Sequence, residues 1–193
     1  MKVLIIHPYR SHGGAESRIR TLVRGLADHD VIEELHLLHA GEPGFHEAEG
    51  KIHRWESDES SCAAVTEAIV THRGVDVVQM HNEQELGTVG LERAQALGLP
   101  TIWVMHDFWP VCGMRFLTHV FAAEQTARCT EVDLDRCVGC VGEDQARLTR
   151  TMGAVIDRCT VGIVPTNRAR EILEGNGLLS GHLEVIHPWI DLS

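Results

Sequence analysis

The stretch that decides the fold is KVLIIHPYRSHGGAE, residues 2–16. An apolar run of strand length at residues 3–6 is followed by the glycine pair Gly13-Gly14, and apolar residues then recur at helical spacing over residues 16–26. Two adjacent glycines let the backbone adopt positive φ angles and let a ligand approach closely. The N–H groups that open the helix suit a phosphate. The stretch therefore predicts a strand, a phosphate-binding glycine loop and a helix, with a plain strand-to-helix turn as the alternative.

Apolar runs and helical segments alternate along the rest of the chain. Further strands are predicted at residues 35–39, 51–55, 76–80, 101–105, 161–164 and 184–186. Further helices are predicted at residues 63–70, 91–97, 147–158 and 166–174, the last with Thr166 as its N-cap. Near-continuous apolar strands that alternate with helices are typical of a parallel sheet covered on both faces. We therefore expect one α/β domain over residues 1–193, built on a Rossmann-like doubly wound parallel sheet.

Length, charge and hydropathy narrow the classes of function. The chain has 193 residues, enough for one sizeable core, and a formal net charge of -11. A field of that sign repels nucleic acid and anionic lipid headgroups, although it is compatible with a local phosphate site. No apolar run approaches the roughly 20 residues that span a bilayer, and the N-terminal run is too short for a signal peptide. We expect a cytoplasmic protein with most of its 13 histidines on the surface.

Polar side chains follow two of the predicted strands. His81 follows one strand, and His106, Asp107 and Trp109 follow the next. Because the carboxyl ends of parallel strands meet at one edge of a sheet, we expect these residues to face the same crevice as the glycine loop. An imidazole there can hydrogen-bond a substrate hydroxyl or a developing charge, and Asp107 would orient His106 or cap a turn. A purely structural role is the alternative for each histidine.

Residues 108–143 show neither strand nor helix periodicity and interrupt this rhythm. A connection of this length in a compact domain is usually functional or held in place by something. It contains Cys112, Cys129, Cys137 and Cys140, and the last two have the C-x2-C spacing of a zinc knuckle. Four thiolates suit structural zinc, and an iron–sulfur cluster has the same ligand count. We predict a Cys-rich insertion over residues 108–143 that is stabilised by a bound metal, with unliganded or oxidised thiols as the alternative.

Several short segments match, in order, the pattern of one enzyme family. The matching segments are residues 2–8, 13–16, 76–82, 98–100, 106–109, 164–166 and 185–191. This ordered set resembles the N-terminal domain of GT-B fold retaining glycosyltransferases of family 4, group 1, over nearly the whole chain. Some members of that family carry a similar set of cysteines after the His-Asp-aromatic-Trp motif, so the resemblance supports the insertion as a unit.

The resemblance implies two Rossmann-like domains with an active site in the cleft between them. This chain would be the acceptor-side domain, with Gly13 and Gly14 near the donor diphosphate and His106 at the transferred sugar. A C-terminal domain, absent from these 193 residues, would hold most of the nucleotide-sugar site. We therefore expect the chain alone to be inactive. No catalytic metal is expected, because GT-B enzymes usually neutralise the leaving diphosphate with protein groups.

The expected function is sugar transfer of the hexosyltransferase type from a nucleotide-sugar donor to a hydroxyl acceptor, in polysaccharide or glycoconjugate biosynthesis. The acceptor would be a glycan, a lipid-linked sugar or a small molecule, and the full-length enzyme would associate peripherally with membranes. Arg18, Arg20 and Arg24 would meet an anionic or lipid-linked acceptor unless they form a solvated helix face. The alternative is a stand-alone nucleotide- or metal-binding module without catalysis. An NAD-dependent oxidoreductase lacks support because the G-x-G-x-x-G spacing is absent.

Overall fold

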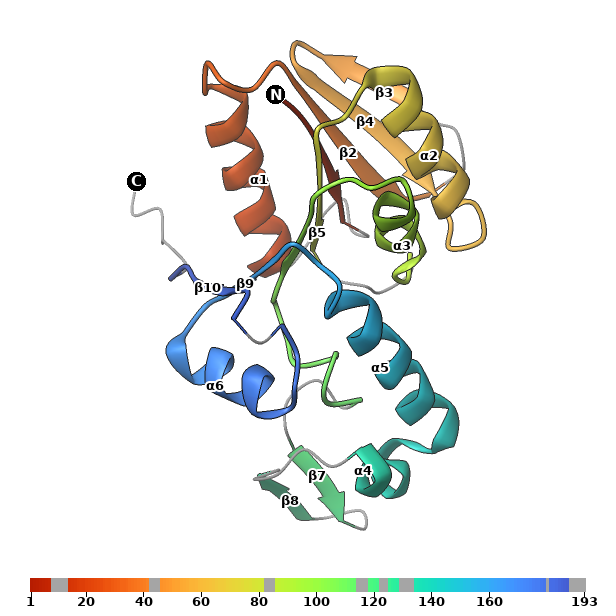
Figure 1. Ribbon diagram of the computed structural model, residues 1–193, viewed down its shortest axis with the longest axis vertical. Coiled ribbons are helices and arrows are strands. Elements are labelled where there is room, and N and C mark those ends of the chain that lie inside the picture. Colours follow the sequence, from red (N-terminus) through yellow and green to blue (C-terminus); the bar gives the residue numbers. More distant parts are fainter. Residues whose placement is uncertain are drawn as a thin grey trace. The chain divides into compact units, whose positions relative to one another are not determined.

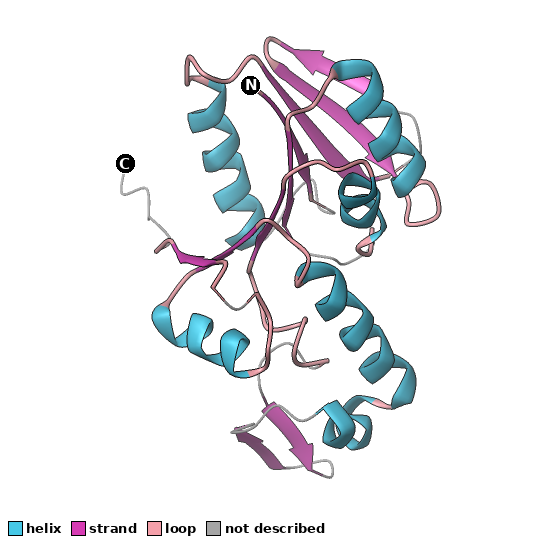
Figure 2. Cartoon of the chain, viewed as in Figure 1, coloured by secondary structure: helices cyan, strands magenta, loops and turns pink. Residues whose placement is uncertain are grey.

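The computed structural model describes residues 1–7, 14–41, 46–81, 86–113, 118–121, 125–128, 134–179 and 181–187. The chain forms two compact units, residues 1–104 and residues 105–193. Both units contain strands and helices, drawn in the colours of the sequence in Figure 1 and by secondary structure in Figure 2. The predicted α/β class is therefore confirmed.

A mostly parallel sheet forms the centre of the N-terminal unit. Its strands lie in the order β6-β5-β1-β2-β4-β3. The parallel strands are β1 (Lys2–Ile6), β2 (Glu34–Ala40), β4 (Ile52–Ser57), β5 (Val77–His81) and β6 (Thr101–Val104). The short strand β3 (His46–Glu49) pairs antiparallel with β4 at the edge. Leu4, Ile5 and Ile6 of β1 are 0% exposed, as expected for a central strand that is covered on both faces.

Helices cover both faces of this sheet, as Figure 1 shows. They are α1 (Gly14–Ala27) on one face and α2 (Cys62–Arg73) and α3 (Val89–Ala96) on the other. On the α1 face, Ile19 and Val23 lie one helical turn apart and pack against Val3, Ile5 and Leu37. Burying each of these branched side chains contributes roughly 1.5–3 kcal/mol. This packing holds α1 against the central strands.

The C-terminal unit combines short strands with three described helices. These elements are β7 (Thr118–Phe121), β8 (Gln125–Arg128), α4 (Leu134–Val141), α5 (Glu143–Ile156), β9 (Val161–Val164), α6 (Asn167–Gly175) and β10 (Leu183–Val185). β9 and β10 are parallel, whereas β7 and β8 form an antiparallel pair. Oγ1 of Thr166 accepts a hydrogen bond from the backbone N–H of Ala169 (3.0 Å), so the predicted N-cap is confirmed. Among the described residues, no helix combines the length and the apolar character needed to cross a bilayer.

Gly153 sets how closely the segment after β6 approaches α5. A Cβ at this position would lie 2.9 Å from the backbone carbonyl oxygen of Pro110. Both residues are buried, and a backbone oxygen cannot swing away as a side chain can. Only glycine therefore fits this approach without a shift of the segment that carries His106, Asp107 and Trp109.

Three features differ from the sequence-based expectations. Residues 108–143, expected to lack regular structure, contain the β7–β8 hairpin and α4. The edge strand β3 was not anticipated, since its four residues are all exposed and show no apolar alternation. Four histidines, His7, His36, His39 and His81, are exceptions to the expectation that most histidines lie on the surface, since each is at most 5% exposed. These four lie in or directly after β1, β2 and β5, where the sheet and its helices exclude water.

Candidate functional site

Three buried histidines gather where neighbouring parallel strands of the N-terminal unit end. His7 directly follows β1, His39 lies near the end of β2, and His81 ends β5. The ring of His7 lies 6.4 Å from that of His39 and 6.3 Å from that of His81, both in edge-to-face orientation. Nδ1 of His7 donates a hydrogen bond to the backbone carbonyl of His81 (3.2 Å). The carboxyl edge of this sheet is therefore lined with imidazoles held in place by main-chain and ring contacts.

The side chain of Gln79 contacts His81 from the same strand. The amide nitrogen of Gln79 lies 2.5 Å from Nε2 of His81, within hydrogen-bond distance. His81 was a predicted site residue, whereas His7 and His39 were not singled out. The sequence marks His7 and His39 in the same way as His81, because each is a polar residue at or near the end of an apolar run.

The glycine loop lies partly within the described chain. Gly14 is the first residue of α1, so the N–H groups of the first helical turn follow it directly. Gly13 lies outside the described residues. The phosphate-binding role of this pair stays a prediction, one that the position of α1 after β1 favours.

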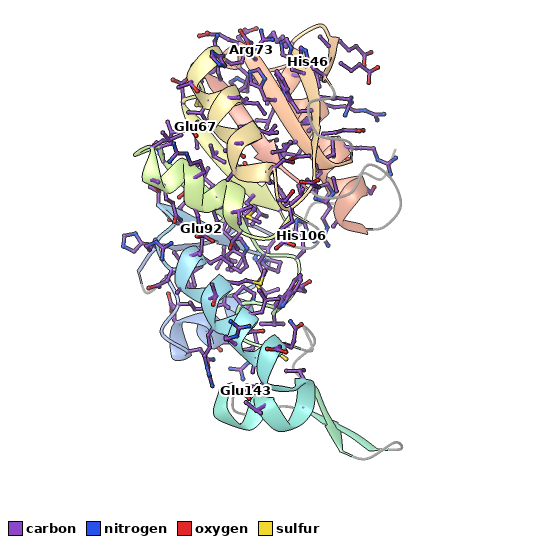
Figure 3. All side chains as sticks on the ribbon, turned by 90° about the vertical axis from the view of Figure 1, so that its right-hand side faces the viewer. His46, Glu67, Arg73, Glu92, His106 and Glu143 are labelled. Atoms are coloured by element: carbon purple, nitrogen blue, oxygen red, sulfur yellow. The ribbon has the colours of Figure 1, made fainter. Side chains whose placement is uncertain are left out.

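The other predicted site residues form a tight turn in the C-terminal unit. Oδ1 of Asp107 accepts a hydrogen bond from the backbone N–H of Trp109 (2.9 Å), and the carbonyl of Phe108 accepts from the N–H of Cys112 (2.7 Å). Asp107 therefore caps a turn, one of the two roles predicted for it. His106, labelled in Figure 3, is half-buried just before this turn. Trp109 is 7% exposed, so most of its ring lies within the protein.

The predicted metal ligands are only partly described. Cys112 is buried after the Asp107 turn, and Cys137 and Cys140 lie three residues apart on α4 rather than in a knuckle-like loop. Cys129 lies outside the described residues. In the part of the chain that the structure describes, no three His, Cys, Asp or Glu side chains form a group that could hold a metal ion. The described thiols alone therefore do not fit a metal centre, and the four-cysteine site stays a prediction.

A second group of histidines occupies the sheet face opposite α1. His36 of β2 is 0% exposed and stacks on His53 of β4, with ring centroids 4.9 Å apart. Trp55 donates a hydrogen bond from Nε1 to Nδ1 of His36 (3.2 Å), and the Glu34 carboxylate lies 3.2 Å from Nε2. His46 stacks on Trp55 at 4.0 Å. Figure 3 shows His46 near Arg73, whose guanidinium lies 5.6 Å from the centre of the Trp55 ring.

This histidine group makes stability depend on pH. Burial and the neighbouring His53 lower the pKa of His36 from 6.5 to about 4, against the opposing pull of Glu34. As the pH falls, the unfolded chain therefore binds this proton before the folded chain does. The contribution of His36 to the free energy of unfolding is complete above pH 6.5 and is lost as the pH falls towards 4. The loss attributable to His36 should reach up to about 3 kcal/mol.

Urea unfolding of the wild type and of His36→Gln at pH 7 and pH 4 measures this loss. Glutamine keeps an acceptor for Trp55 but does not titrate, so the variant should lose clearly less stability between the two pH values. His72→Ala, a change at an exposed histidine near the end of α2, should lose as much as the wild type. Equal losses in wild type and His36→Gln would rule out His36 as the cause.

The chain is similar to one protein family and to several solved structures. The sequence model of the family described as Glycosyltransferase Family 4 matches residues 12–193. No curated protein matches the chain significantly. Among solved structures, the chain is similar to a UGT transferase from Siraitia grosvenorii in complex with UDP, with a TM-score of 0.60 and 12% identity over 100% of this chain and 49% of that one.

Two further structures share the fold. UDP-GlcNAc 2-epimerase from Methanocaldococcus jannaschii has a TM-score of 0.55 and 15% identity, over 96% of this chain and 45% of that one. A Medicago truncatula protein complexed with UDP-glucose has a TM-score of 0.56 and 13% identity, over 99% and 52%. The chain thus spans about half the length of the solved structures that it resembles. At these identities the likeness shows the fold alone, that of an N-terminal GT-B domain.

Proposed function

The chain belongs to glycosyltransferase family 4, and on that premise we propose that it is the acceptor-side domain of a retaining glycosyltransferase. The enzyme moves a sugar from a nucleotide-sugar donor to a hydroxyl acceptor, in polysaccharide or glycoconjugate biosynthesis in the cytoplasm. The single observation that carries this proposal is the family match over residues 12–193. The fold shared with a UDP-bound transferase supports it, although an epimerase shares the same fold, so the fold alone does not choose the reaction.

The reaction breaks the bond between the sugar and the diphosphate and forms a bond from the anomeric carbon to the acceptor oxygen. The diphosphate leaves with one additional negative charge, and the proton of the acceptor hydroxyl passes to the leaving diphosphate or to water. In this proposal Gly13 and Gly14 let the diphosphate approach the N-terminal turn of α1, whose N–H groups and dipole favour an anion. Differential stabilisation of this leaving charge is what accelerates the step.

His106 is proposed to contact the transferred sugar near the reacting carbon. It comes two residues after β6 ends, and β6 is paired in parallel with β5, which ends in His81. The Asp107 turn holds the backbone on one side of His106. His81 and Trp109, predicted from the sequence as further substrate-binding residues, are 3% and 7% exposed, so a contact between either ring and a sugar stays a prediction. The remaining donor contacts belong, in this proposal, to a C-terminal domain outside residues 1–193.

Turnover by the natural full-length protein and by the 193-residue chain, measured side by side, tests this division of labour. Nucleoside diphosphate release from a panel of nucleotide sugars should be measurable for the full-length protein and absent for the chain, because the chain supplies only the acceptor side. Turnover by the purified 193-residue chain would contradict the division. A full-length protein that binds nucleotide without any turnover would favour a non-catalytic binding module instead.

A further inference from the structure

The N-terminal unit contains a cavity of about 610 Å³ beside α1. Its walls come from α1, from the strands β2 and β4 and from the edge strand β3. His7 and His39 line it as well, so the cavity reaches the carboxyl ends of β1 and β2. A volume of this size is within the range of pockets that hold small ligands. The cavity lies entirely within residues 1–104.

Three arginines line this cavity in a protein that is strongly acidic overall. Arg20 and Arg24 lie one turn apart on α1, and Arg54 lies on β4. The chain carries 28 acidic residues against 17 Lys and Arg. Three arginines around one cavity are therefore opposite in charge to the protein as a whole. Like charges four residues apart on a helix repel one another, which costs a few tenths of a kcal/mol without a counter-charge.

These guanidinium groups have no carboxylate partner among the residues that the structure describes. Arg54 faces Glu47 directly across the β3–β4 pair, yet the two side chains form no ion pair. Arg20 and Arg24 likewise form none with any described carboxylate. The planar fork of a guanidinium binds carboxylate or phosphate through two hydrogen bonds, so the three groups can serve an anionic ligand.

The other residues that line the cavity can bind the hydroxyl groups and the ring of a ligand whose anionic group contacts the arginines. Glu47 and Glu49 of β3 also face the cavity, and carboxylates accept hydrogen bonds from hydroxyl groups. Ile19, Val23 and Leu37 supply apolar surface that can pack against the C–H face of a ring. A purely anionic ligand would gain nothing from the two glutamates, whereas a ligand with both hydroxyls and a negative group would use every wall.

We propose that this cavity binds an anionic sugar, one that carries a phosphate or carboxylate group held by Arg20, Arg24 and Arg54. Given the proposed glycosyl transfer, this ligand is the acceptor, and its hydroxyls point towards the strand ends at His7 and His39. The shared chemistry is a negatively charged, hydroxyl-rich ring, supplied by a sugar phosphate or by a uronic acid.

Equilibrium titration of the 193-residue chain tests the proposal without any donor. The probes are glucose 6-phosphate, glucuronate and neutral glucose. Ligand-observed NMR measures the binding of each probe. At least one anionic probe should bind about tenfold or more tightly than glucose, the effect of one charge-assisted hydrogen bond, and its binding should weaken as salt is added. Whether the phosphate or the carboxylate binds more tightly identifies the source of the charge.

Matched variants locate the binding. Arg20→Met and Arg54→Met should each weaken binding of the anionic probe about tenfold. The sequence grouped Arg18 with Arg20 and Arg24, but Arg18 is exposed and does not line the cavity, so Arg18→Met is the control on the same helix. Far-UV circular dichroism of each variant identifies any loss of folding. Equal binding of glucose and both anions, or an equal effect of Arg18→Met, overturns the proposal. The titration needs no turnover, so a failure of the proposed transfer reaction is detected separately in the donor assay.

Discussion

His106→Ala in the full-length protein is expected to lower kcat by about two to three orders of magnitude. The imidazole is proposed to hydrogen-bond the transferred sugar where charge develops in the transition state, and a methyl group offers no such contact. His106 is half-buried and lies outside the helices and strands, so the substitution should leave the fold intact. Steady-state release of nucleoside diphosphate from the preferred donor measures the effect.

His72→Ala provides the matched control for that substitution. His72 is exposed near the end of α2, so its replacement removes an imidazole without touching the proposed site. The control should keep wild-type kcat, and both variants should unfold within about 1 kcal/mol of the wild type. A kcat for His106→Ala within a few-fold of the control would remove His106 from the reacting centre.

Gly153→Ala is expected to destabilise the protein by about 1–3 kcal/mol, although alanine is the better helix former. The new Cβ would lie 2.9 Å from the carbonyl oxygen of Pro110, so the backbone after β6 must shift. That backbone carries the Asp107 turn and His106, and a displacement of a few tenths of an ångström there should also lower kcat. Urea unfolding and steady-state kinetics of the full-length protein measure the two effects.

Gly25→Ala separates this contact from the general effect of replacing a helical glycine. Gly25 lies in α1, and a Cβ there has nothing within 4 Å, so the variant should be as stable as the wild type or up to about 1 kcal/mol more stable. If Gly153→Ala were as stable as Gly25→Ala, the close approach of α5 to the backbone of Pro110 would not contribute to stability.

The central strands were predictable because burial selects their side chains. Residues 3–6 and 161–164 form uninterrupted apolar runs, and the structure has β1 and β9 there, β1 with one additional residue at its start. The edge strand β3 has the sequence HEAE and is exposed throughout, so its existence depends on pairing with β4 rather than on its own pattern. The β7–β8 hairpin is likewise defined by its antiparallel pairing.

Strand ends alone selected His81, His106 and Asp107 as candidates, because parallel strands place their carboxyl ends at one edge. The roles of these residues in binding or catalysis stay predictions. His7 and His39 were missed because a histidine count says nothing about burial, and both are buried where β1 and β2 end. Arg20 and Arg24 could be singled out from the sequence, but the cavity that they share with Arg54 could not, since its wall includes β3, an element that the sequence does not reveal.

If this chain contributes to retaining sugar transfer, the product must keep the anomeric configuration of the donor sugar. The full-length protein would be supplied with a panel of nucleotide sugars and hydroxyl acceptors, and the product would be analysed by proton NMR. We expect one donor to be consumed and the transferred sugar to keep the anomeric configuration that it had in that donor. A product with inverted configuration, or no consumption of any donor, would contradict this expectation.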